Sequence, residues 1–204
     1  MTDLVIPGLP FRLKSEGRPS GHVPRFISDG IELTAGPRAD LFLDPQGTDD
    51  PPDAERFVAP IAGNFVLSAL VTVNFENTFD SGVLIGYVAE STWFKVCAER
   101  DPQGIPRIVS VVTRQGASDD SNGWPLTLPG VYLRVARLGH AFALHASNDG
   151  SIWRLIRYFS LGVSDETPIK IGLLAQSPTG PGVTVRFEKI DFGVDQLTDL
   201  RNGS

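Results

Sequence analysis

The chain has 204 residues, of which 41% are hydrophobic and 21% charged, an ordinary composition for a globular protein. The formal net charge of -6 argues against a nucleic-acid partner, because neutralising phosphates requires a basic surface. One cysteine excludes an intrachain disulfide and favours a reducing compartment. The N-terminal residues lack a secretory signal pattern, and no apolar run approaches the roughly 20 residues that span a bilayer. We therefore expect a cytoplasmic protein without a membrane segment.

Short apolar segments with strand-like patterns run along most of the chain. Every second residue from Phe65 to Phe75 is apolar, which places these side chains on one face of a strand. Similar segments cover residues 82–89, 92–99, 107–113, 131–138, 140–147, 152–161, 169–176 and 183–193. Each is rich in Val, Ile, Leu and Phe and is bounded by turn-forming residues. This spacing predicts an all-β fold, a two-sheet antiparallel sandwich forming a single domain over residues 1–204. The acidic, proline-rich residues 44–56 are expected to form an exposed loop.

Two hairpins are predicted from their turn residues. Asn148, Asp149 and Gly150 separate two apolar runs, and an Asp-Gly pair supplies the positive φ that a tight hairpin requires. Gly139 separates residues 131–138 from the following strand in the same way.

Residues 92–99 place an unusual set of side chains on one face. Because side chains alternate along a strand, Trp93, Lys95, Cys97 and Glu99 share one face, and the intervening apolar residues Phe94, Val96 and Ala98 face the core. The same alternation turns His145 away from the core residues of its strand and places Gln176 on the opposite face to Leu173 and Ala175. Strand alternation therefore provides several polar groups that could meet outside the core.

The segment that follows Arg114 is rich in oxygen donors. Ser118, Asp119, Asp120 and their neighbours provide the ligand type that a hard cation prefers. The segment lacks the spaced acids of a dedicated calcium loop, and Asp and Ser also bond to their own backbone in turns. We therefore expect a loop stabilised by local bonds or by a salt bridge to Arg114, and no metal site.

No complete catalytic or cofactor motif is present, so no cofactor is expected. The three histidines are scattered, Cys97 lies in mid-strand without a group to lower its pKa, and no G-x-S-x-G sequence occurs. Glycoside hydrolysis requires two facing carboxyls. Glu99 and Asp101 are the closest pair on one face, but the turn sequence DPQGIP places Asp101 in a loop, and the E-x-D-x-E strand of many jelly-roll glucanases is absent.

Four pieces of the chain carry a family resemblance: "FDSGVLIGYVAESTWFKVCAE", "VSVVTRQGASDDSN", "YLRVARLGHAFALHASNDGSIWRLIRYFSL" and "GLLAQSPTG…VRFEKIDF". Over residues 31–192 they resemble the family called domain of unknown function 1349, a member of the concanavalin A-like lectin/glucanase group of jelly rolls. The matching residues are Trp93, Lys95, Glu99, Thr113, Arg114, Ser118, Asp119, Asp120, Arg134, Arg137, His145, Ser147, Trp153, Arg157, Gln176 and Ser177. The resemblance implies a jelly roll with one concave face and does not imply an activity.

Seven polar residues are the candidate ligand-binding set, expected to gather on or around the concave sheet. They are Lys95, Glu99, Arg114, Asp119, His145, Arg157 and Gln176. The first functional hypothesis is a domain that binds a small polar ligand, plausibly a carbohydrate, beside an exposed aromatic such as Trp93 or Trp124. The second is a glycan-active enzyme using Glu99, assisted by His145 or Asp119. The third is a regulatory protein-interaction module with an exposed apolar patch, and self-association stays open.

Overall fold

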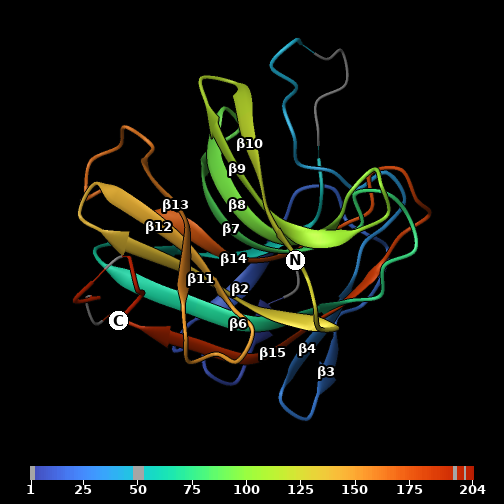
Figure 1. The fold of residues 1–204 in the computed structure, drawn as a ribbon, viewed down its shortest axis with the longest axis horizontal. Coiled ribbons are helices and arrows are strands. Elements are labelled where there is room, and N and C mark those ends of the chain that lie inside the picture. Colours follow the sequence, from blue (N-terminus) through green and yellow to red (C-terminus); the bar gives the residue numbers. More distant parts are fainter. Residues whose placement is uncertain (1–2, 48–52, 195–196, 200) are drawn as a thin grey trace.

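The computed structural model describes residues 3–47, 53–194, 197–199 and 201–204. It contains two antiparallel sheets that pack face to face, and the described residues contain no helix. In Figure 1, the strands of residues 81–125 curve along one layer, and those of residues 65–73, 130–147 and 184–193 run side by side in the other. The expected two-sheet antiparallel jelly-roll sandwich is therefore confirmed.

One sheet has eight strands. In spatial order they are β1 (Asp3–Val5), β2 (Arg12–Glu16), β5 (Arg56–Ile61), β14 (Ile169–Gln176), β7 (Ser81–Ala89), β8 (Thr92–Arg100), β9 (Pro106–Arg114) and β10 (Ala117–Pro125). The other sheet has seven strands. In spatial order they are β13 (Arg154–Ser160), β12 (Ala141–Ser147), β11 (Gly130–Leu138), β6 (Phe65–Val73), β15 (Thr184–Gly193), β4 (Gly30–Thr34) and β3 (Arg25–Ile27).

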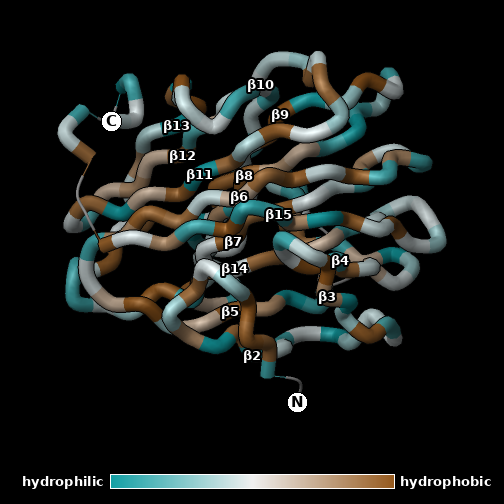
Figure 2. The backbone as a smooth tube through the Cα atoms, turned by 90° about the horizontal axis from the view of Figure 1, so that it is seen from below, coloured by the Kyte–Doolittle hydropathy of each residue, from teal (hydrophilic) through white to brown (hydrophobic). Residues whose placement is uncertain are grey.

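The core lies between the sheets and consists of the alternating apolar residues of the central strands. Phe94 of β8 packs against Phe142 of β12, with ring centroids 4.9 Å apart. At Gly82 of β7 the layers are so close that an added Cβ would lie 2.5 Å from a Val71 methyl and 2.6 Å from a Val185 methyl. Hydrophobic residues accordingly concentrate along the central strands, with hydrophilic ones at the loops (Figure 2). The core side of β8 is thus the predicted one.

Both predicted hairpins are confirmed. Strands β11 and β12 pair from Leu138 and Ala141 onward, and Gly139 between them has a φ of 58°. Strands β12 and β13 also pair directly, with Gly150 at a φ of 77° in the connection. Strands β1–β5 lack a clear strand pattern in the sequence, because they are short and separated by Pro, Gly and charged residues.

The acidic segment after Arg114 is a strand, and the predicted loop is wrong. Gln115 and Gly116 adopt φ values of 55° and 80°, which is the backbone of a two-residue hairpin turn. The chain then returns as β10, with Ala117 opposite Arg114 and Asp120 opposite Val111. β10 is the last strand of its sheet, and charged side chains on an edge strand prevent pairing with other chains. This explains why a strand carries so few apolar residues.

Residues 35–43 form a covering segment over the outer face of the eight-stranded sheet, the face turned away from the other sheet. The amide of Ser177 donates to the carbonyl of Ala39 at 3.0 Å, and the amide of Ser118 donates to the carbonyl of Leu43 at 2.9 Å. The Ser118 hydroxyl also accepts a bond from the Leu43 amide at 2.9 Å. Of the predicted loop at residues 44–56, residues 48–52 lie outside the described residues. No helix in the described ranges is long and apolar enough to cross a membrane.

Candidate functional site

A pocket opens on the outer face of the eight-stranded sheet, where strands β14, β8, β9 and β10 meet the covering segment. Its volume is about 220 Å³. Its polar lining residues are Asp40, Lys95, Glu99, Asp120 and Gln176, and its apolar ones are Phe42, Phe79, Val109, Val111 and Pro178. Strand register explains the convergence, since Lys95 lies opposite Val111 and Val111 lies opposite Asp120. The pocket therefore has a polar set of groups beside an apolar wall.

Lys95 is a buried cation at the floor of this pocket. Only 3% of the residue is exposed, and its Nζ donates to Oε1 of Gln176 at 3.0 Å. The Gln176 amide in turn donates from Nε2 to Oδ1 of Asp40 at 2.7 Å. No carboxylate in the described part of the chain lies within ion-pair distance of Lys95. The ammonium therefore retains N–H donors that the protein does not use.

Glu99 is a carboxyl group with unused acceptors. Its side chain makes no hydrogen bond or ion pair with any of the described residues. Burial raises the pKa of Glu99 to about 7, and although the charge of Lys95 lowers it, Asp40 and Asp120 oppose that effect. A carboxyl that titrates near neutral pH and lacks a protein partner is typical of functional sites.

Asp120 is a further carboxyl of the pocket, and unlike Glu99 it is exposed to solvent. Its side chain lines the pocket, and within the described ranges it has no hydrogen bond or ion pair. Two carboxyl groups without protein partners therefore face one buried ammonium.

Phe79 forms part of the apolar wall with a strained backbone. Its φ is 66°, a left-handed conformation that is rare for a bulky residue. The strain is held by the neighbouring residue Asp80, whose buried carboxylate accepts bonds from the amides of Glu76 (3.0 Å) and Asn77 (2.7 Å) and from the Ser177 hydroxyl (2.6 Å). Strained residues cluster at functional sites. The conformation places an aromatic residue that is 37% exposed beside the polar groups.

Cys97 lies between Lys95 and Glu99 on the same strand but does not add reactivity. It is fully buried, and burial raises the pKa of its thiol far above the ordinary value. Only the thiolate is an effective nucleophile. Cys97 therefore packs as a core residue.

Three of the seven candidate residues meet in the pocket: Lys95, Glu99 and Gln176. Asp119 and Arg157 do not reach it, because Asp119 points to the opposite side of β10 from Asp120. There its Oδ2 accepts a bond of 2.6 Å from the guanidinium of Arg157 on β13. Arg114 also bonds toward β13, at 3.3 Å from the carbonyl of Ser160. These contacts form a seam between β10 and β13, and the expected salt bridge of Arg114 to the acidic segment is replaced by the Asp119–Arg157 pair.

His145 lies on the other sheet and is also absent from the pocket. It is fully buried in β12, opposite Arg134 of β11. Arg134 stacks 3.6 Å from the ring centroid of Trp153 and donates to the carbonyl of Gly203. Alternation put His145 on the correct side of its strand, but the chain's last residues and Trp153 cover that side.

A second hollow lies across the covering segment, on the same face of the sheet. Leu41, Leu43, Arg56, Tyr87 and Trp93 are among its lining residues. The Arg56 guanidinium lies 4.2 Å from the centroid of the Tyr87 ring.

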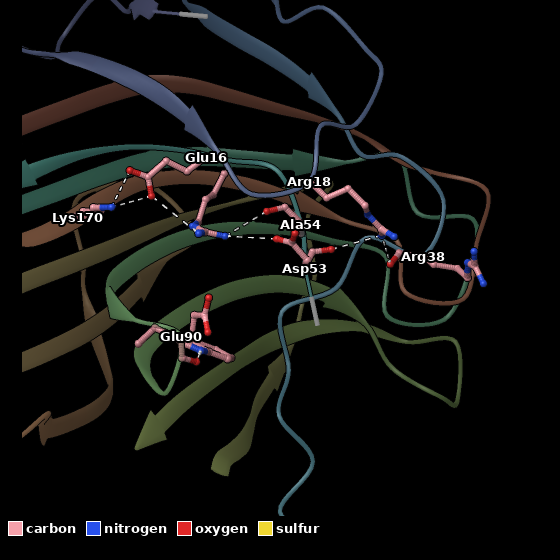
Figure 3. A network of polar contacts seen from close by, with 9 residues as sticks. Glu16, Arg18, Arg38, Asp53, Ala54, Glu90 and Lys170 are labelled. Carbon is pink, nitrogen blue, oxygen red and sulfur yellow. Dashed lines mark hydrogen bonds and ion pairs between the residues drawn. The ribbon is translucent and has the colours of Figure 1, made fainter. Parts of the chain in front are cut away.

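An ion-pair network includes Asp53 and Arg56 from the lining of this hollow. Glu16 accepts a bond of 2.7 Å from Lys170 and lies 3.9 Å from Arg56, and Arg56 lies 3.7 Å from Asp53. Figure 3 follows this network from Lys170 through Glu16 to Asp53 and Ala54, and on to Arg18. The charged groups here are largely paired with one another, whereas the pocket contains carboxyls without a protein partner among the described residues.

Sequence reasoning missed several pocket residues. Trp93 is fully buried and Trp124 lies elsewhere, beside Arg154, so neither is the expected exposed aromatic. Phe42 and Phe79 take that place. One signal was available: residues 40–43 read Asp-Leu-Phe-Leu, an alternation that turns Asp40 and Phe42 to the pocket and Leu41 and Leu43 to the second hollow.

Among the described residues, no group of three or more His, Cys, Asp or Glu side chains is arranged to hold a metal ion.

A comparison with family profiles identifies the family of this chain. The profile described as "Protein of unknown function (DUF1349)" matches residues 22–194. The chain belongs to the DUF1349 family. A search of curated proteins found no match.

Solved structures share the fold of this DUF1349 chain. A functionally unknown protein from Saccharomyces cerevisiae has a TM-score of 0.78 at 18% identity, over 90% of this chain and 97% of the yeast chain. The GH43 protein BlXynB from Bacillus licheniformis has a TM-score of 0.66 at 12% identity, over 81% of this chain and 33% of that one. GH43B of a Bacteroides ovatus xyloglucan locus has a TM-score of 0.65 at 15% identity, over 81% and 32%. The chain thus spans about a third of these GH43 chains.

Proposed function

We propose that this DUF1349 chain binds a small polyhydroxylated molecule, a carbohydrate, in the pocket of Lys95, Glu99, Asp120 and Gln176. One observation carries the proposal: a buried ammonium and two carboxyls without protein partners share a pocket of about 220 Å³ with an apolar wall. Buried polar groups are normally satisfied within the protein. Those left unused in a pocket are the groups that a ligand satisfies.

A hydroxyl group can bond both to the unused carboxylate acceptors and to the unused ammonium donors of this pocket. It donates to a carboxylate and accepts from an ammonium, so neighbouring hydroxyls on one ring bridge Glu99 or Asp120 to Lys95. Phe42, Phe79 and the two valines offer an apolar surface to the C–H groups of a sugar ring. The volume lies below the roughly 300–1,000 Å³ of pockets for larger ligands, which favours a single ring. The similarity to GH43 chains supports the fold only, and shared fold is analogy for function.

A thermal-shift screen with a matched pair of variants tests this proposal. The parent is screened against mono- and oligosaccharides, beside Asp120→Asn and the control Asp119→Asn, which changes the same residue type one position away on the other side of β10. A ligand that binds only the folded state raises Tm. We expect a sugar-dependent rise that is lost in Asp120→Asn and kept in Asp119→Asn. A panel without any shift, or equal loss in both variants, contradicts the proposal.

A second candidate function, a glycan-active enzyme, is favoured by the pKa of Glu99. A carboxyl with a pKa of about 7 is suited to general acid catalysis at neutral pH. Asp40 and Asp120 line the same pocket and provide the second carboxyl that glycoside hydrolysis requires. His145 and Asp119, the helpers expected from the sequence, lie elsewhere. Turnover of aryl glycosides that Glu99→Gln abolishes supports the enzyme, and sugar binding without turnover supports the binding domain.

A further inference from the structure

We propose that the ligand of this pocket carries an ammonium group beside its hydroxyls, as an amino sugar or amino polyol does. This inference rests on the proposed function and narrows its ligand class. It places the ligand ammonium between Glu99 and Asp120, with the hydroxyls on Lys95.

The charge of the lining is the first argument. Three carboxyl groups, from Asp40, Glu99 and Asp120, line the pocket with one ammonium, from Lys95. None of these four groups has an ion pair within the described part of the chain. Asp120 is exposed and Asp40 and Glu99 are half-buried, and charges in such a partly shielded site repel one another more strongly than in bulk water. A cationic ligand removes this imbalance, whereas a sugar phosphate or sugar acid increases it.

The positions of the donors are the second argument. Lys95 donates to Gln176, and Gln176 donates to Asp40. Among the carboxyls of the pocket, Asp40 is therefore the one that accepts a hydrogen bond from a described side chain of the lining. Glu99 and Asp120 accept nothing from the described residues. An ammonium offers donors that form charge-assisted bonds to carboxylates, which are shorter and stronger than neutral ones. The unused acceptors therefore match a ligand cation better than a further hydroxyl.

The neighbouring cations do not supply the missing charge. Arg107 lies opposite Glu99 on β9, but its guanidinium is held by Asp101, with Nε 2.7 Å and Nη2 2.5 Å from Oδ2. The neighbours of Glu99 on its own strand are Lys95 and Cys97. On the surrounding elements they are Ser81 of β7, Gln176 of β14, Asp120 of β10 and Asp40 of the covering segment. Lys95 is thus the one available cation among these described neighbours, and the acids outnumber it.

Calorimetric titration with two isosteric polyols tests the charge directly. One probe is the Tris cation, which has three hydroxymethyl groups and an ammonium, and the other is tris(hydroxymethyl)ethane, in which a methyl group replaces the ammonium. Both are titrated at pH 7 into the parent, Asp120→Asn and the control Asp119→Asn. We expect the cation to bind at least about tenfold more tightly than its neutral isostere, with that preference lost in Asp120→Asn and kept in Asp119→Asn.

A second pair of probes separates this inference from the proposed function. Glucosamine and glucose differ in an ammonium and a hydroxyl, and we expect the parent to prefer glucosamine. The ammonium inference is overturned if the cationic and the neutral probe of each pair bind with equal affinity. It is also overturned if Tris gives no heat of binding while a neutral sugar binds. Either result leaves the carbohydrate proposal standing. If no probe binds and the sugar screen also shows no shift, both fail.

Discussion

Asp119 and Asp120 are adjacent in sequence but belong to two different regions of the molecule. Asp119 lies in the seam between β10 and β13, where its carboxylate is paired with Arg157 at 2.6 Å. Asp120 points to the other side of the same strand, into the pocket, and has no partner among the described residues. The two acids have the same chemistry, so the difference in their surroundings alone separates a structural contact from a candidate ligand contact.

Glu99 and Asp101 show the same difference at the end of β8. The carboxylate of Asp101 accepts bonds from the amides of Gln103 (2.9 Å) and Ile105 (2.8 Å) and from Arg107 (2.7 Å). Burial raises the pKa of Asp101, but these bonds outweigh it and bring the pKa below the ordinary value. Glu99 lacks such donors, and burial raises its pKa to about 7. Satisfied carboxyls thus hold the fold, and unsatisfied ones are available to a ligand.

The largest expected effect is that of Glu99→Gln, which should remove binding and increase stability. We expect an affinity loss of at least about 100-fold, because a charge-assisted contact to the ligand is lost. The folded-state pKa of about 7 lies above the ordinary value of about 4.3, so the folded parent binds more protons than the unfolded chain in this interval. The parent's free energy of unfolding should therefore fall as pH rises from about 4 to about 7, by on the order of 2 kcal/mol.

Urea unfolding of parent and Glu99→Gln at several pH values measures this difference. The variant lacks the titrating group, so its free energy of unfolding should fall less over that interval and exceed the parent's above pH 7. A variant that is less stable than the parent at pH 8, with an unchanged pH dependence, would show that Glu99 is a structural carboxyl like Asp101.

Phe79→Gly should have an intermediate effect, confined to binding. Glycine adopts the left-handed φ of 66° without the roughly 1 kcal/mol that another residue incurs there, which offsets the loss of a ring that is partly exposed. We expect a free energy of unfolding within about 1 kcal/mol of the parent's and affinity for the ligand reduced by about tenfold. Phe79→Ala is the matched control, since it loses the ring but keeps the strain, and it should be the less stable variant. Unchanged affinity in both would exclude Phe79 from the site.

The smallest expected effect distinguishes the two adjacent acids by stability. Asp119→Asn should lower the free energy of unfolding by about 0.5–1 kcal/mol, the value of a partly exposed ion pair, since 58% of its side chain is accessible. Asp120→Asn should leave stability unchanged or slightly raised, because it removes one of several like charges. Chemical unfolding at pH 7 measures both. A larger loss in Asp120→Asn would reverse the roles given to the two residues.

The fold was predictable because apolar alternation specifies strands and their core faces, as residues 92–99 show. β10 was missed because an edge strand needs few apolar residues. Once the turn at Gln115 and Gly116 is taken as a two-residue hairpin, register alone places Asp120, rather than Asp119, beside Val111.

The rest of the pocket was not predictable from local patterns. Asp40 and Phe42 come from a segment without regular structure, which reaches Gln176 through contacts 136 residues apart in sequence. Strand alternation states on which side of a sheet a residue lies, but not which segment covers that side. The same limit applies to His145, since its side of the strand was correct but its cover was unknown.

The most direct test of the account is an NMR titration of the isotope-labelled chain with the carbohydrate panel, following backbone amides and the Glu99 carboxyl. A binding sugar should shift the signals of residues that line the pocket, Lys95, Glu99, Asp120 and Gln176, and change the pKa of Glu99 from about 7. Signals of Asp119 and Arg157 in the seam should stay in place. Shifts centred on the seam or the second hollow, with the Glu99 titration unchanged, would contradict it.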